Sequence, residues 1–189
     1  MANLALFDFD HTLYKKDSLL EFTKFYVGNK FYFGVFLLSP WLIRLKLGLI
    51  NNEKVKLKYF RHFFANLNYN DFTTIGETFA KRKIPENLDK EIFRNFEQHL
   101  ANGDLVYIVT ASASEWIQPW SAQYNVEVIG TKIQVQNGIL TGKFDSNNCY
   151  GPEKVNRIKQ IINLADYDSI SVYGSGKGDF EMLQLRSTL

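Results

Sequence analysis

The sequence lacks the features that mark disulfide-rich, zinc-cluster or nucleic-acid-binding proteins. Its single cysteine excludes an intrachain disulfide framework and zinc sites built from clustered thiolates. Its 22 lysines and arginines nearly balance 20 aspartates and glutamates, so no strong positive field exists to attract nucleic acid. The first 13 residues show no signal-peptide pattern. We therefore expect a cytoplasmic protein that does not bind nucleic acid.

The sequence also lacks an apolar run long enough to span a bilayer. The longest run covers residues 31–43 and stops at Arg44, whereas a spanning helix needs roughly 20 apolar residues. The pattern favours a buried helix of a small bundle, kinked or broken at Pro40. Apolar residues nevertheless continue to Ile50, so a helix that lies on a membrane surface is kept as the alternative.

What the sequence does contain is an alternation of strand and helix patterns. Short runs of apolar, β-branched and aromatic residues predict strands, and Asn137-Gly138 is a strong signal for a hairpin turn. The predicted strands cover residues 4–9, 105–110, 126–129 and 170–173, and a hairpin covers residues 133–144. Helices are predicted at residues 114–124, at residues 152–164 and from residue 180 onward.

The order of these elements predicts an α/β fold. Strands that alternate with helices form a doubly wound parallel sheet with helices on both faces. The helical stretch at residues 15–95 is too long for an ordinary crossover between two strands, so we interpret it as a small helical-bundle cap inserted after the first strand. The predicted core then comprises residues 1–14 and 96–189.

Polar residues gather where ligands bind in such a sheet, beyond the carboxyl ends of the strands. Asp8 and Asp10 follow the first strand, and Thr110 ends the second. Lys154 begins a helix, and Asp179 follows the last strand. Together they supply a nucleophile, a proton donor, a hydroxyl, a cation and a further carboxylate. Phosphoryl transfer assisted by a divalent cation needs this set of groups.

Four motifs occur in order over nearly the whole chain: DFDHT at 8–12, VTAS at 109–112, GPEKV at 151–155 and YGSGKGD at 173–179. In these motifs the chain resembles the haloacid dehalogenase (HAD) superfamily of hydrolases, and within it subfamily IB, the phosphoserine phosphatase-like enzymes. The resemblance implies a HAD-like Rossmannoid core. It also implies a Mg²⁺-dependent phosphatase that hydrolyses a small phosphomonoester through an aspartyl-phosphate intermediate.

The resemblance implies a role for each matching residue. Asp8 is the expected nucleophile, and Asp10 is the expected acid/base that protonates the leaving alkoxide and then activates water. Thr110 and the backbone N–H of Ala111 are expected to hydrogen-bond the phosphoryl group. Lys154 is expected to balance the negative charge of Asp8 and the phosphate together.

The expected metal ligands include one departure from the family pattern. Mg²⁺ would bind the carboxylate of Asp8, the main-chain carbonyl of Asp10 and acidic groups of the last motif. The family usually has an acid directly after Tyr-Gly, but Ser175 stands there and leaves Asp179 as the motif's carboxylate. Either Asp179 suffices, or more Mg²⁺ is needed, or the site is a weak phospho-ligand-binding relic. We favour the first two, because both aspartates of the first motif are present.

The cap is expected to select the substrate. Asp17 matches an acid that reads the substrate amine in phosphoserine phosphatases, although it also suits a helix N-cap. Arg61 or Arg44 could read a carboxylate from the cap helices. The many phenylalanines and leucines of the cap suit a lipid phosphate equally well. The expected partner is therefore a small-molecule phosphate ester that is phosphoserine-like, with a lipid phosphate at a membrane surface as the alternative.

Overall fold

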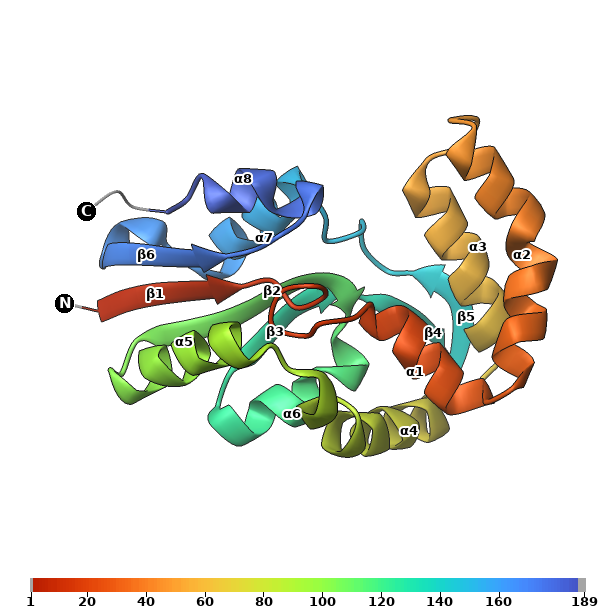
Figure 1. Ribbon diagram of the computed structural model, residues 1–189, viewed down its shortest axis with the longest axis horizontal. Helices are drawn as coiled ribbons and strands as arrows, with labels where there is room; N and C mark the ends of the chain where they lie inside the picture. The colour runs from red at the N-terminus through yellow and green to blue at the C-terminus, as the bar shows by residue number, and fades with distance from the viewer. Residues whose placement is uncertain (1, 187–189) are drawn as a thin grey trace.

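The computed structural model describes residues 2–186, in which helices and strands alternate along the chain (Figure 1). The strands are β1 (Ala2–Phe7), β2 (Leu105–Ala113), β3 (Glu127–Thr131), β4 (Ile133–Gln136), β5 (Ile139–Phe144) and β6 (Tyr167–Tyr173). The α-helices are α1 (Ser18–Val27), α2 (Lys30–Lys46), α3 (Asn52–Phe64), α4 (Tyr69–Arg82), α5 (Lys90–Ala101), α6 (Gln118–Ser121), α7 (Pro152–Ile161) and α8 (Phe180–Leu183). Short 3₁₀ helices cover Pro85–Asn87, Ser114–Trp116, Ala122–Tyr124, Leu164–Asp166 and Lys177–Asp179.

Four strands form one parallel sheet in the order β3-β2-β1-β6. Their carboxyl ends therefore meet at one edge, which lies toward the right in Figure 1. Helices α5 and α6 cover one face of the sheet, and α7 and α8 cover the other (Figure 1). The predicted α/β fold with a helix-flanked parallel sheet is confirmed.

Strand β1 shows why both faces of the sheet carry helices. Successive side chains of a strand point to opposite faces, and every side chain from Leu4 to Phe7 is completely buried. Leu4 and Leu6 belong to the apolar cluster under α7, whereas Ala5 and Phe7 belong to the cluster that includes Phe96 of α5. The strand is apolar on both sides, as is typical of a central parallel strand.

Helices α1 to α4 follow β1 and lie beside the carboxyl edge of the sheet (Figure 1). Their aromatic side chains extend the core cluster, and Phe22 of α1 stacks on Trp116 with ring centroids 4.8 Å apart. Helix α5, capped by Asp89, covers β2 as a single element. The limits of the cap, residues 15–95, stay a prediction, although the second limit falls inside α5.

A separate antiparallel hairpin, β4 and β5, packs against the cap. It turns at Asn137 and Gly138, whose φ angles of 51° and 75° match the predicted hairpin turn. Phe144 of β5 packs against Phe60 of α3, with ring centroids 5.1 Å apart. The segment between α3 and α4 also exchanges main-chain hydrogen bonds with β5. The hairpin therefore fastens the cap to the rest of the fold.

The predicted helix at residues 114–124 is wrong as a single element. The structure has a 3₁₀ turn, the four-residue α6 and a second 3₁₀ turn in its place. Pro119 lies at the second position of α6 and has no N–H to bond back to the preceding turn. A proline is tolerated at the start of a helix but not in its interior, so the chain forms short turns here.

Helix α2 also differs from the prediction, because it is neither broken at Pro40 nor buried on most of its surface. It continues through Pro40 as one 17-residue helix. Only Gly34 and Leu38 are buried, and much of its apolar surface faces outward. Among residues 2–186, no helix is long and apolar enough to cross a membrane.

Candidate active site

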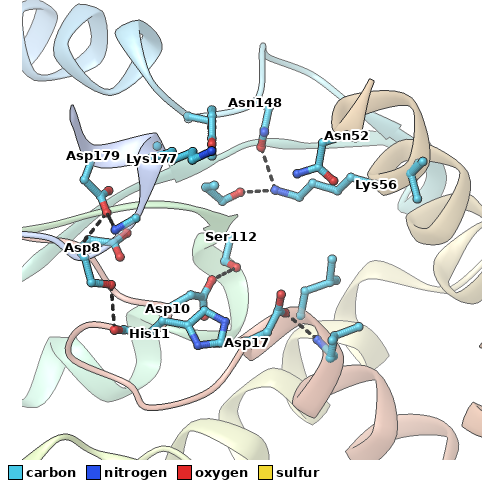
Figure 2. Close-up of a pocket in the computed structure, with 18 of the residues that line it drawn as sticks. Asp8, Asp10, His11, Asp17, Asn52, Lys56, Ser112, Asn148, Lys177 and Asp179 are labelled. Atoms are coloured by element: carbon cyan, nitrogen blue, oxygen red, sulfur yellow. Dashed lines mark hydrogen bonds between the residues drawn. The ribbon is translucent and has the colours of Figure 1, made fainter. Parts of the chain in front are cut away.

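The loop after β1 brings two carboxylates to the carboxyl edge of the sheet. The N–H of Asp8 donates to the carbonyl of Tyr173 at 2.8 Å, which ties this residue to the end of β6. The Asp8 carboxylate accepts a 2.9 Å hydrogen bond from the hydroxyl of Thr12. The chain then turns at His11, whose φ is 60°. Asp10 consequently faces the same cavity as Asp8, as Figure 2 shows.

Lys154, at the start of α7, joins the first and last motifs. Its ammonium donates to Asp8 Oδ1 and Asp179 Oδ1, each at 2.6 Å, and to the carbonyl of Val109 at 2.7 Å. An ammonium has three donors, so all three are used. Only 1% of the residue is exposed. Burial lowers the pKa of Lys154, but the two carboxylates outweigh burial and raise it above its ordinary value.

Asp10 lies in a different environment from Asp8, without a cation in hydrogen-bond contact. Its carboxylate accepts hydrogen bonds from the Ser112 hydroxyl at 2.5 Å and from the Ser18 N–H at 2.7 Å. Burial raises the pKa of Asp10 to about 6, the negative charges of Asp17 and Asp8 add to this rise, and the two hydrogen bonds oppose it. A carboxyl group with such a pKa can both give and take a proton near neutral pH.

The last motif holds its carboxylate through the main chain. Asp179 Oδ2 accepts from the N–H of Ser175 at 3.1 Å and from the N–H of Gly176 at 2.8 Å. A Cβ on Gly174 would lie 2.7 Å from the Cβ of Asp179, so only glycine allows this close packing. The Ser175 hydroxyl donates to the carbonyl of His11 at 2.9 Å, which joins the two loops.

The donor atoms at this edge fit a magnesium ion with few protein ligands. Within residues 2–186, no group of three or more His, Cys, Asp or Glu side chains could hold a metal ion. Asp8, Asp179 and the Asp10 main chain nevertheless offer an oxygen-only donor set. Mg²⁺ is usually held by one or two carboxylates, with waters and substrate phosphates completing its shell. Ser175 adds only a neutral hydroxyl beside them.

A cavity of about 430 Å³ lies over these groups, which is a size typical of small-molecule sites. Helix α3 of the cap contributes Lys56 to its far side (Figure 2). The Lys56 ammonium donates to the Ala111 carbonyl at 2.5 Å and to Asn148 Oδ1 at 2.7 Å. Burial lowers the pKa of Lys56 to about 8, although the negative charges of Asp10 and Asp17 oppose this effect.

The sequence motifs did not identify Lys56 or Ser112 as site residues. Lys56 belongs to no motif, and its only signal is its place on one face of α3 with Asn52 and Tyr59, which also line the cavity. Ser112 stands at the end of the second motif and takes the contact with Asp10. Both residues become recognisable only when the cap is placed over the sheet.

Most of the predicted site residues meet at this cavity, but Thr110 does not line it. Its side chain is completely buried, and its hydroxyl accepts a 3.0 Å hydrogen bond from the N–H of Ser112. The expected contact of the Thr110 hydroxyl with a phosphoryl group stays a prediction. The predicted residues that line the cavity are Asp8, Asp10, Asp17, Ala111, Lys154, Ser175 and Asp179.

The two arginines proposed to read a carboxylate do not line the cavity either. Arg61 lies against β5, where its Cα is about 3.0 Å from the position that a Cβ on Gly142 would take. At about 100° per residue, Arg61 falls on the opposite side of α3 from Lys56 and its cavity-lining neighbours. Arg44 is exposed and lies over the ring of Trp41, 5.8 Å from its centroid.

Comparisons with known proteins agree with this fold. The family model of the haloacid dehalogenase-like hydrolases matches residues 5–184. Protein CicA of Caulobacter vibrioides is 32% identical over 184 residues, which is 96% of this chain and 82% of that protein. The chain therefore belongs to the haloacid dehalogenase-like hydrolase family, as its motifs indicated.

Solved structures show the same fold at lower identity. A protein of unknown function from Bordetella pertussis Tohama I superposes with a TM-score of 0.84 at 24% identity, covering 98% of this chain and 87% of that chain. A phosphoserine phosphohydrolase-like protein from Francisella tularensis subsp. tularensis SCHU S4 gives a TM-score of 0.69 at 19% identity, with coverages of 97% and 82%. The structural neighbours thus include phosphoserine phosphatase-like members of the family.

Proposed function

We propose that this hydrolase is a Mg²⁺-dependent phosphatase that cleaves a small phosphomonoester through a phosphorylated Asp8. The observation that carries the proposal is the buried ammonium of Lys154, which contacts both Asp8 and Asp179 at 2.6 Å. This arrangement offsets negative charge where a dianionic phosphate would meet an anionic nucleophile. Asp10, with its pKa raised to about 6 by burial, faces the same cavity as a proton donor.

The proposed reaction has two displacements at phosphorus. A carboxylate oxygen of Asp8 attacks phosphorus, the bond from phosphorus to the ester oxygen breaks, and the Asp10 carboxyl donates its proton to the leaving alkoxide. The Asp10 carboxylate then takes a proton from water. The water oxygen attacks phosphorus, the bond to Asp8 breaks, and inorganic phosphate leaves. The hydrogen bonds from Ser112 and Ser18 hold the Asp10 carboxyl in place for both proton transfers.

Hydrolases of this family generally use Mg²⁺, and the oxygen donors described above fit it. Asp8, Asp179 and the main-chain carbonyl of Asp10 would hold the ion, which would offset the charge of the phosphate oxygens when bound. The cap closes over the site through Lys56, whose ammonium reaches across to Ala111 and Asn148 of the core.

The charges on the cavity wall support a phosphoserine-like ester with a charged group near its phosphate. Asp17 lines the cavity from the start of α1, where it also caps the helix by accepting from the Leu20 N–H at 3.0 Å. Its second carboxylate oxygen can receive an ammonium group of a substrate. Lys56 stands on the opposite wall and provides the cation that Arg61 was expected to provide. A substrate carboxylate would compete with Ala111 and Asn148 for this ammonium.

The first test is hydrolysis of p-nitrophenyl phosphate by the Asp8→Asn variant during a Mg²⁺ titration. Because the amide cannot form the acyl phosphate, we expect kcat to fall by at least about a thousandfold. Circular dichroism should show an intact fold. Asp145→Asn changes an exposed aspartate on the loop after β5 and is the matched control. Unchanged turnover by Asp8→Asn would remove Asp8 from the mechanism. Absence of turnover by the wild type at every Mg²⁺ level, with phosphate still bound, would support the relic.

The second arm of this experiment uses Asp10→Asn and rapid mixing. The nitrophenolate leaving group departs without a proton, so the first displacement should continue in this variant. The second displacement lacks its base and should slow by about 10²- to 10⁴-fold. We therefore expect a burst of about one equivalent of nitrophenol followed by slow turnover. A steady state without a burst would contradict the role of Asp10 in hydrolysing the intermediate.

A further inference from the structure

The outward side of helix α2 exposes several large apolar side chains. Phe33 and Phe36 are 66% and 70% exposed, and Leu47 and Leu49 at the end of the helix are exposed to a similar extent. A helix that is apolar on every side is normally buried on every side. Here the inner side packs on α1 and α3, while the outer side is open, and Figure 1 shows α2 as the outermost helix of the cap. Such a surface is a candidate for contact with a partner.

Seven exposed apolar side chains form one continuous stripe, which we call the α2 stripe, while exposed Leu42 lies outside it. At about 100° per residue they all fall within less than half of the helix circumference. The α2 stripe consists of Tyr32, Phe33, Phe36, Leu37, Pro40, Ile43 and Leu47.

The chain segment that carries the α2 stripe has charged residues of one sign. Residues 22–52 contain four basic side chains and no aspartate or glutamate, although the whole chain has a net charge of only +2. Two of the basic residues, Arg44 and Lys46, stand in the last turn of α2. Arg44 and Lys58 also lie over the ring of Trp41, at 5.8 and 5.3 Å from its centroid. Aromatic and leucine side chains edged by lysine and arginine are typical of helices that lie in an anionic membrane interface.

We propose that the protein docks on an anionic bilayer through the α2 stripe, with the helix parallel to the membrane plane. A second copy of this chain fits the surface less well, because a two-fold contact would bring the positive charges of residues 22–52 together. An anionic lipid surface supplies both the apolar layer for the stripe and the negative charge for its edges.

In the docked orientation, the cavity would open close to the α2 stripe. Leu42 of α2 and Leu20 of α1 line the catalytic cavity, and both remain more than 40% exposed. Leu42 directly precedes Ile43 of the α2 stripe, so the cavity rim and the membrane-facing surface share one helix. If the proposed phosphatase activity is correct, this arrangement favours a phosphate ester whose apolar part stays in the bilayer.

The test is flotation with vesicles of phosphatidylcholine, with and without phosphatidylglycerol, at low and high salt. The wild type should float with the anionic vesicles, and high salt should weaken this binding. The double variant Phe33→Gln/Phe36→Gln should bind at least about tenfold more weakly, because it removes two rings from the interface. Ile161→Gln changes an exposed apolar residue on α7 and should bind as the wild type does.

Equal binding of the wild type and the double variant would overturn the proposal, as would no flotation of the wild type at low salt. A dimer in sedimentation that the double variant abolishes, without any flotation, would show instead that a second copy covers the stripe. The double variant should hydrolyse soluble p-nitrophenyl phosphate at the wild-type rate. Failure of docking and failure of the phosphatase mechanism are therefore distinguishable.

Discussion

The protein has buried carboxylate oxygens in two regions, and the two regions differ in the partners that these oxygens have. At the carboxyl edge of the sheet, Asp8 and Asp179 share the ammonium of Lys154, and each also accepts further hydrogen bonds. Beside α4, Glu115 has a buried Oε2 with no hydrogen-bond partner among the described residues. Burial raises the pKa of Glu115 to about 7, and a hydrogen bond from Ser114 opposes this only in part.

The difference shows what a partner does for a buried acid. Burial raises the pKa of both Asp8 and Glu115, but at Asp8 the Lys154 ammonium and the hydrogen bond from Thr12 oppose this rise, whereas at Glu115 only hydrogen bonds oppose it. The catalytic region therefore depends on one lysine that serves two acids. Three variants test this comparison: the first removes the cation, the second adds a carboxylate beside a metal site, and the third removes the charge of Glu115.

Lys154→Met should have the largest effect, because it leaves Asp8 and Asp179 buried without their cation. Removing one partner from a buried ion pair typically costs about 3–5 kcal/mol, and urea unfolding near neutral pH should show a loss of this size. Phosphatase activity should disappear as well. Lys159→Met, an exposed position on the same helix, is the control and should change stability by less than about 0.5 kcal/mol. A small loss for Lys154→Met would mean that the carboxylates do not need this ammonium.

Ser175→Asp should make the catalytic region depend more strongly on Mg²⁺. Without metal, the added carboxylate repels Asp179 and should lower the melting temperature. With Mg²⁺, the same carboxylate supplies a third anionic ligand, and we expect metal affinity to rise by about tenfold. Thermal unfolding across a Mg²⁺ titration measures both effects. Ser175→Asn has the same size without the charge and should not gain affinity. A tighter metal response in both variants would show that charge is not the cause.

Glu115→Gln should have the smallest effect on stability, and it should stabilise the protein instead of destabilising it. The pKa in the folded state is raised from 4.5 to about 7, so the stability that the neutral carboxyl contributes is present below pH 4.5 and is lost as pH rises through about 7. The glutamine variant should match the wild type near pH 4.5 and be more stable than it near pH 8, where the wild-type carboxylate is charged. Melting temperatures across this range provide the measurement, with exposed Glu97→Gln as control. A constant difference at all pH values would contradict the assigned cause.

Local sequence patterns were sufficient for the fold. The apolar run at residues 4–7 marks a strand because its side chains are buried on both faces of the sheet. Asn137-Gly138 marks the hairpin turn because both residues tolerate positive φ. The helix at residues 114–124 was predicted wrongly because apolar spacing outweighed the signal of Pro119. The sequence favoured a buried α2 and kept a surface helix only as the alternative, because an apolar run does not reveal which of its faces has neighbours.

The candidate site was predictable where residues follow the ends of strands or begin helices. Asp8 and Asp10 could be found because the carboxyl ends of parallel strands all lie at the edge of the sheet where ligands bind. Lys56 and Arg61 both lie on α3, but only the docked position of that helix decides which one reaches the cavity. Thr110 and Ser112 differ in the same way, since the geometry at the end of β2 decides which hydroxyl faces Asp10.

The contacts described above between the hairpin and the cap belong to α3 and the segment after it, and α2 is held in the fold by other contacts. Main-chain hydrogen bonds fix the segment between α3 and α4 to β5, while α2 itself packs on α1 and α3. Helix α2 also has defined ends, with Gly28 in a positive-φ turn before it and Asn51 capping the next helix after it. Under the two proposals above, replacing residues 29–50 would change the docking surface and the cavity rim, while Asp8, Lys154 and Asp179 would keep their contacts.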